Sequence, residues 1–266
     1  MACECVTLCT GGDVGGDAAG LLVDYAAIES RAAEFGGVYR ANSPFPHIAI
    51  DGFLPRLTVE RLLREYPADQ GLPIWNDATV ADKRGEGYVQ KDKRNIRDVL
   101  RMPPTYRQLV WELNSARFLA FLATLSGIPS LLPDPTLRGG GIHQIGAGGF
   151  LKLHADFTFH RELGLDRRLN VLLYLNERWP ASYGGDLQLW DKDLRGPPVR
   201  IAPLLNRCVV FSTTADSYHG HPEPLTCPEG VFRKSIALYY YTNGRPPGEA
   251  EPTFATLWRD VPEAGR

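Results

Sequence analysis

The sequence has little net charge, no long apolar run and no regular spacing of cysteines. Its 29 Lys and Arg residues stand against 31 Asp and Glu residues, a formal net charge of −2. This balance argues against a nucleic-acid-binding surface, which normally shows a basic surplus. The longest apolar run, residues 118–125, is interrupted by Thr124 and is far shorter than a membrane span. We therefore expect neither nucleic acid nor a membrane as a partner.

The cysteines also argue against a secreted disulfide framework. Cys3, Cys5 and Cys9 crowd the N-terminus, whereas Cys208 and Cys227 lie in the C-terminal half, and the total is odd. The first residues have neither a basic start nor a long apolar stretch, as a signal peptide would. These features predict a cytoplasmic protein.

The domain organisation expected from the sequence is simple. The glycine-rich stretch 11–20 predicts a flexible leader over residues 1–20, and the N-terminal cysteines lack the fourth ligand of a zinc knuckle. No repeat and no linker divides residues 21–266, so we expect one domain. Its first part, 21–135, is expected to be a helical region, and 136–245 its β-sheet core.

Helical spacing of apolar residues marks most of the helices. The pattern predicts a helix over 21–35, a second beginning with Thr58 as N-cap, and two more over 105–113 and 115–126. In contrast, the segment 77–98 has charges of both signs and few apolar residues. We predict a surface loop there, with a lid over an active site as the functional alternative.

From residue 137 onward, short apolar segments alternate with turn signals, and a further strand lies between the first two predicted helices. This pattern indicates a mainly β fold with flanking helices, a two-sheet jelly roll. The expected strands are 47–51, 137–145, 150–157, 168–175, 186–190, 199–201, 207–211 and 234–242.

Three residues predict a metal site. His154 and Asp156 point to the same face of their strand because side chains alternate along a strand. With the distant His219 they supply two imidazoles and one carboxylate, the facial set that binds Fe(II) and leaves three positions open. His221 shares the strand parity of His219 and is the alternative third ligand.

A cation and a hydroxyl follow the second histidine motif. Arg233 can receive a carboxylate bidentately, and Ser235 lies on the same strand face. Together with a metal, this pair supplies what 2-oxoglutarate requires: chelation of its keto acid end and a salt bridge to its far carboxylate. A surface position for Arg233, paired with Glu223 or Glu229, is the alternative.

The succession of motifs between residues 44 and 242 resembles the Fe(II)- and 2-oxoglutarate-dependent dioxygenases of the prolyl-4-hydroxylase-like superfamily. The motifs are Pro-Phe-Pro-His-Ile-Ala-Ile-Asp-Gly-Phe-Leu-Pro (44–55), Gly-Gly-Phe-Leu-Lys-Leu-His-Ala-Asp (148–156), Arg-Leu-Asn-Val-Leu-Leu-Tyr-Leu-Asn (168–176), Gly-Gly-Asp-Leu-Gln-Leu-Trp (184–190) and His-Gly-His-Pro-Glu-Pro-Leu (219–225).

The resemblance implies a double-stranded β-helix, iron held by His154, Asp156 and His219, and 2-oxoglutarate anchored by Arg233, with O2 as the oxidant. The gap from His219 to Arg233 is longer than is usual in that family. Because the position of Asp156 holds a carboxylate, the resemblance implies hydroxylation or another C–H oxidation rather than halogenation. We expect a small-molecule substrate, an amino acid or a biosynthetic intermediate. The alternatives are a peptidyl prolyl hydroxylase and a catalytically silent binding domain.

Further candidates surround the predicted site. Asn170 and Tyr174 share a strand face and are candidates for the 2-oxoglutarate pocket, with hydrogen bonding in the core as the alternative role. The candidate substrate contacts are His143, Gln144, His160 and Arg161.

Overall fold

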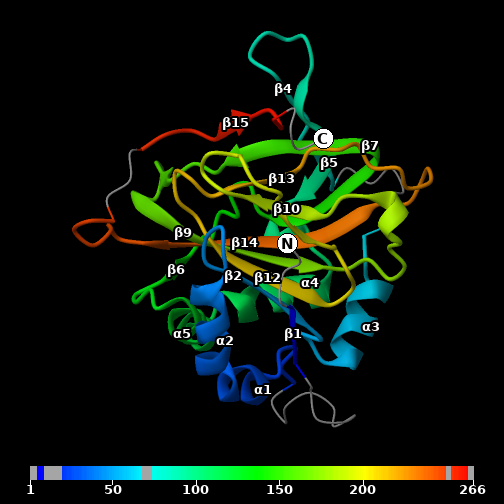
Figure 1. The fold of residues 1–266 in the computed structure, drawn as a ribbon. Helices are drawn as coiled ribbons and strands as arrows, with labels where there is room; N and C mark the ends of the chain where they lie inside the picture. Colours follow the sequence, from blue (N-terminus) through cyan, green and yellow to red (C-terminus); the bar gives the residue numbers. More distant parts are fainter. Residues whose placement is uncertain (1–4, 9–19, 68–73, 250–252, 263–266) are drawn as a thin grey trace.

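The computed structural model describes residues 5–8, 20–67, 74–249 and 253–262. One strongly curled, mainly antiparallel sheet forms the body of the molecule, and the helices gather along one side of it (Figure 1). This architecture confirms the expected β-rich jelly roll with flanking helices. The helices are α1 Tyr25–Ser30, α2 Ala32–Ala41, α3 Arg56–Arg64, α4 Pro104–Leu113 and α5 Ala116–Ser126, with short 3-10 turns at Val99–Arg101 and Ala181–Tyr183.

The main path of the sheet runs β1-β2-β12-β9-β14-β7-β13-β10-β11. Most neighbours along this path are distant in sequence, so the site residues come from separated segments. The strands are β1 Cys5–Thr7, β2 His47–Asp51, β3 Asn76–Asp77, β4 Val80–Ala81, β5 Tyr88–Ile96, β6 Leu132–Pro133, β7 Gly141–Ala155, β8 Phe159–His160, β9 Leu165–Tyr174, β10 Leu187–Trp190, β11 Val199–Ile201, β12 Arg207–Ser212, β13 Tyr218–His221, β14 Arg233–Thr242 and β15 Leu257–Arg259.

The long strand β7 joins the two halves of the fold. Its first part, residues 141–145, pairs with β14, whereas its second part pairs with β13, which places His219 opposite His154. We expected two strands with a turn at Gly146–Gly149, and this was wrong. The glycines instead accompany a register shift against β5, and a side chain at Gly149 would lie 2.5 Å from the Ile145 side chain. They let one strand bend without ending it.

The charged segment 77–98 is not the irregular loop that its composition predicted. β3 and β4 pair with β5, and β5 pairs along most of its length with β7. Only Val89, Gln90 and Ile96 of β5 are buried, while Asp92 and Arg94 face solvent. Strand pairing uses backbone hydrogen bonds, so a strand with one solvent-exposed face needs few apolar side chains.

The N-terminal part departs from the sequence predictions in three places. Residues 5–7 form β1, parallel to β2, rather than a flexible leader; Cys3 and Cys9 lie outside the described residues. The helix expected over 21–35 is two helices, α1 and α2. Thr58 lies inside α3, where its hydroxyl donates to the Leu22 carbonyl instead of capping the helix.

The two later helices form as expected. The Ser115 hydroxyl accepts a hydrogen bond from the Phe118 N–H at the start of α5, and Gly127 ends the helix with φ of 75°. Their apolar faces pack against α2 and the outer side of the sheet, where the main core lies. Within the described ranges, no helix is both long and apolar enough to cross a membrane.

Candidate metal centre and co-substrate pocket

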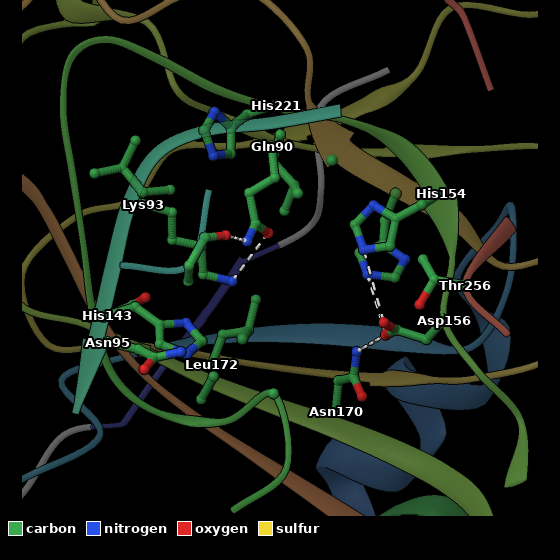
Figure 2. Close-up of a pocket in the computed structure, with 18 of the residues that line it drawn as sticks. Gln90, Lys93, Asn95, His143, His154, Asp156, Asn170, Leu172, His221 and Thr256 are labelled. Carbon is green, nitrogen blue, oxygen red and sulfur yellow. Dashed lines mark hydrogen bonds and ion pairs between the residues drawn. The ribbon is translucent and has the colours of Figure 1, made fainter. Parts of the chain in front are cut away.

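A cavity of about 460 Å³ lies inside the curl of the sheet. Its wall is built from β5, β7, β9, β13 and β14, together with residues at the C-terminal end of the described chain. Figure 2 shows His154 and Asp156 on one side of this cavity and Lys93, His143 and His221 on the other. The two sides differ in how their polar groups are satisfied.

On the first side, His154, Asp156 and His219 converge. One ligand atom from each lies within 4.8 Å of the others, and the two imidazole centroids are 4.3 Å apart. His154 is the last residue of β7 that pairs with β13, Asp156 follows two residues later, and His219 is brought across by β13. The cluster therefore depends on β7 pairing with β13 in this register.

The orientation of both imidazoles suits metal binding. Nδ1 of His154 lies 2.9 Å from the Lys152 carbonyl oxygen, and Nδ1 of His219 lies 2.9 Å from that of Ser217. A carbonyl only accepts, so Nδ1 carries the proton and Nε2 keeps its lone pair. Burial, then the neighbouring His219, lowers the pKa of His154 to about 3. The ring stays neutral, the form that binds metal.

The carboxylate of Asp156 is held by two donors. Its Oδ2 accepts hydrogen bonds of 2.8 Å from both the Arg167 guanidinium and the Asn170 amide. Burial opposes ionisation, but the Arg167 charge and the adjacent His219 hold the pKa of Asp156 well below its usual range. The carboxylate is thus ionised and oriented, and its Oδ1, 3.7 Å from His154 Nε2, faces the cluster.

Arg167 was missing from the sequence predictions. It is almost fully buried, and its guanidinium stacks 3.6 Å from the ring centroid of Tyr239 and 4.6 Å from that of Phe157. The signal was its place at the start of β9, three residues before Asn170. Trp258 of β15 was also missed, and its ring packs 4.9 Å from that of His154.

Two imidazoles that present Nε2 to the cluster and one oriented carboxylate fit Fe(II), which accepts nitrogen and oxygen ligands on one face. The hydrogen bonds from the two imidazoles to the Lys152 and Ser217 carbonyls, and from Arg167 to Asp156, are of the kind that hold metal ligands in place.

The Arg233 guanidinium lies deeper along the same wall. Its Nε donates to the Gly185 carbonyl at 2.7 Å, and one terminal nitrogen donates to the Tyr174 hydroxyl at 3.1 Å. Ser235 sits opposite Tyr174 in the pairing of β14 with β9, and all three side chains line the cavity. The remaining donors of Arg233, with both hydroxyls, form a receptor for a carboxylate.

The other predicted candidates separate into two groups. Asn170 lines the cavity, but its amide is engaged by Asp156, and His143 lines it with Nε2 3.1 Å from the Gly140 carbonyl oxygen. Gln144 points to the opposite face of β7 from His143, where its Oε1 accepts from the Tyr66 hydroxyl.

His160 and Arg161 do not line the cavity. His160 is fully buried beside Asp134, 3.7 Å from its carboxylate, and Arg161 is exposed on the following turn. Sequence proximity to the metal strand made them candidates, but the chain turns away from the site at Phe157.

His221 lines the cavity but is not part of the three-residue cluster. Within the described chain, neither of its ring nitrogens has a hydrogen-bond partner, although His221 is only 2% exposed. Burial, with Arg233 and Lys93 nearby, holds the pKa of His221 well below its usual range. His221 is therefore a neutral imidazole facing the cavity.

Lys93 was also missed by the sequence reasoning, because it lies in the segment expected to be a loop. It projects from β5 into the cavity (Figure 2). Burial lowers its pKa to about 8, although the charge of Asp156 acts in the other direction. At neutral pH most Lys93 side chains still carry a positive charge.

Three comparisons place these features among known proteins. Residues 140–241 match the family model of the 2OG-Fe(II) oxygenase superfamily. The chain is 25% identical over 216 residues to "Prolyl 3-hydroxylase OGFOD1" of Xenopus laevis, an alignment that covers 80% of this chain and 38% of that protein. The chain thus spans well under half the length of this curated relative.

Solved structures share the fold at low sequence identity. A prolyl hydroxylase from Trichoplax adhaerens, in complex with a peptide of a hypoxia inducible factor, has a TM-score of 0.55 at 16% identity, covering 80% of this chain and 91% of its own. A prolyl-4-hydroxylase from Pseudomonas putida has a TM-score of 0.53 at 17% identity, covering 78% and 98%.

Proposed function

Since the chain is a member of the 2OG-Fe(II) oxygenase superfamily, a dioxygenase that uses Fe(II), 2-oxoglutarate and O2, we propose that it hydroxylates a prolyl residue of a polypeptide. The observation that carries this proposal is the nature of its relatives. The curated relative is a prolyl 3-hydroxylase, and two of the similar solved structures are prolyl hydroxylases, one of them with a peptide bound.

In this proposal His154, Asp156 and His219 hold the iron. Arg233, Ser235 and Tyr174 receive the far carboxylate of 2-oxoglutarate. When bound, iron, 2-oxoglutarate and O2 supply the oxidising power: 2-oxoglutarate is converted to succinate and CO2, and one oxygen atom enters a substrate C–H bond. The chain orients these reactants and keeps Asp156 ionised through Arg167.

The surroundings of the cavity are compatible with a polypeptide. Asp77, Thr79 and Val80, at or beside the exposed β3 and β4, contribute to its wall, as do Thr256 and Trp258 near the other end of the chain. The segment around β4 projects beyond the body of the sheet (Figure 1). A side chain of an extended substrate can enter between such surface segments, whereas a fully enclosed cavity would admit only small molecules.

The relatives therefore favour the polypeptide substrate over the small molecule expected from the sequence. The test compares both in one assay. Purified protein is incubated with Fe(II), 2-oxoglutarate, ascorbate and either a proline-centred peptide library or free amino acids, including L-proline. We expect a mass increase of 16 units on peptides, with equimolar succinate, and the added oxygen on the proline residue by fragmentation.

The matched controls are Asp156→Ala, which removes a proposed iron ligand, and Arg161→Met, which removes an exposed cation away from the cavity. Oxidation should disappear in the first and persist in the second. Oxidation of free amino acids with unmodified peptides would refute the polypeptide proposal, and succinate formation that needs neither iron nor Asp156 would refute the assigned site.

A further inference from the structure

Lys93 and His221 have no role in holding iron or 2-oxoglutarate as proposed above, yet both face the cavity (Figure 2). Among the described residues, the only hydrogen bond of the Lys93 ammonium is a long one, 3.4 Å to Oε1 of Gln90. His221 has none at either nitrogen. Polar groups away from solvent are normally well hydrogen-bonded, so an ammonium on a cavity wall with only one long hydrogen bond is placed to bind an anion from the cavity.

The charges of the cavity indicate the kind of ligand. Its inner wall carries three cations, Lys93, Arg167 and Arg233, and one carboxylate, Asp156. Adding Fe(II) and the doubly negative 2-oxoglutarate changes this sum by +2 and −2, so a net charge of +2 remains. The exposed Asp77 at the surface offsets only part of it. An anionic group on the primary substrate would complement this surplus.

The surplus cation is Lys93. Arg167 is paired with Asp156, and Arg233 has hydroxyl partners placed for the far carboxylate of 2-oxoglutarate. Lys93 stands across β7 from Arg233, since both are paired with Ile145 from opposite sides. At the usual strand spacing their backbones are about 10 Å apart. One carboxylate held by Arg233 therefore leaves Lys93 available for another.

We propose that Lys93, on the cavity wall that His221 also lines, binds a carboxylate of the primary substrate and so selects substrates with an acidic group close to the oxidised carbon. The ammonium supplies a charge and N–H donors, which suit a carboxylate better than an uncharged amide. The inference rests on the proposed function: in a polypeptide the acid is a Glu or Asp flanking the target proline, and in a small molecule it is a free carboxylate.

Substrate preference provides the test. A library with three randomised positions on each side of proline is treated with the iron- and 2-oxoglutarate-loaded enzyme, and hydroxylated peptides are sequenced. We expect Glu and Asp to be enriched over Gln and Asn by about tenfold or more, the size of a charge-assisted hydrogen bond. Lys93→Met should reduce this enrichment to about twofold or less. Lys93→Glu should favour Lys and Arg instead.

Lys91→Met is the matched control. Lys91 lies two residues earlier on β5, is partly exposed beside Asp92 and does not line the cavity. In Lys91→Met, the enrichment of Glu and Asp over Gln and Asn should equal that of the wild type. The affinity for 2-oxoglutarate, measured from the visible band of the anaerobic Fe(II) complex, should be unchanged in Lys93→Met. A loss of that affinity equal to the loss of substrate selection would assign Lys93 to the co-substrate and overturn the inference.

A second arm separates this inference from the polypeptide proposal. Binding of free and N-acetylated amino acids, each paired with its carboxamide, is measured by calorimetry on protein loaded with Ni(II) and 2-oxoglutarate, which does not turn over. If no peptide is hydroxylated but carboxylates bind better than carboxamides in a Lys93-dependent way, the polypeptide proposal fails and the subsite stands. The subsite is overturned if the wild-type enzyme hydroxylates Glu and Gln peptides equally and binds each carboxylate no better than its carboxamide.

Discussion

The two sides of the cavity differ in how completely their polar groups are satisfied. At the metal side, each imidazole has a backbone carbonyl at Nδ1, and Asp156 has Arg167 and Asn170. At the opposite side, Lys93 has one long hydrogen bond and His221 has none among the described residues. The first side is organised before any ligand binds. At the second, burial disfavours the charged form of Lys93, so substitutions at the two sides should have opposite effects on stability.

The largest effect is expected from removing a proposed ligand at the metal side. His219→Ala should abolish both the visible band of the anaerobic Fe(II) and 2-oxoglutarate complex and the formation of succinate, because two ligands do not hold iron in this geometry. His221→Ala should keep the band. The reverse pattern would assign the third ligand to His221.

Next in size is the loss of the buried partner of Asp156. Arg167→Met leaves the carboxylate buried with the Asn170 amide alone, and we expect the free energy of unfolding to fall by about 3–5 kcal/mol. Iron affinity should fall about 10- to 100-fold, as when other residues that orient a metal ligand are removed. Urea unfolding and iron titration measure the two effects. A stability equal to the wild type would show that the Arg167 pair is not a structural requirement.

The opposite sign is expected across the cavity. Lys93 has a pKa lowered from 10.5 to about 8, so the fold disfavours its charged form. Between these values the unfolded state binds more protons, so stability rises with pH there and the full cost is present at neutral pH. Lys93→Met should therefore raise the free energy of unfolding at pH 7 by about 1–3 kcal/mol. A destabilised variant would mean that Lys93 is already well paired in the ligand-free protein.

The smallest effect concerns acid stability. The pKa of His221 lies well below its usual range because of burial. As pH falls below about 6.5, His221 binds a proton in the unfolded state but not in the folded state, so the free energy of unfolding decreases. In metal-free protein, His221→Phe should reduce the slope of stability against pH between 7 and 5 by at most about 1.4 kcal/mol per pH unit. Denaturant unfolding at several pH values measures this slope. An unchanged slope in the variant would indicate that His221 has a hydrogen-bond acceptor nearby that keeps its pKa normal.

Much of the fold follows from local patterns that tertiary contacts do not overrule. The apolar face of α5, its Ser115 cap and Gly127 are read correctly because they depend on near neighbours. β5 and the bend in β7 are misread for the opposite reason. Their conformation depends on a partner strand distant in sequence, which neither low apolar content nor glycine content reveals.

The candidate site divides in the same way. His154, Asp156, His219 and Arg233 could be proposed from the sequence because spacing and chemical type carry information along the chain, and the structure places all four on the wall of one cavity. Gln144, His160 and Arg161 were misplaced because adjacency in sequence does not give strand parity across a bend or the direction of a following turn. Arg167 and Lys93 were missed because a charged residue on a strand that points into a cavity or the core looks like a surface residue until its neighbours are known.

The sequence by itself thus determined the kinds of groups available: imidazoles and a carboxylate of the kind that binds a metal, a guanidinium of the kind that binds a carboxylate, and enough apolar periodicity for a jelly roll. Only the tertiary structure decided which of these groups have partners. Strand pairing aligns His219 with His154 and gives Asp156 its Arg167. It leaves Lys93 with one long hydrogen bond and His221 with none among the described residues. The physical reason is that the pKa and hydrogen bonding of a buried group depend on atoms contributed by strands far apart in the chain.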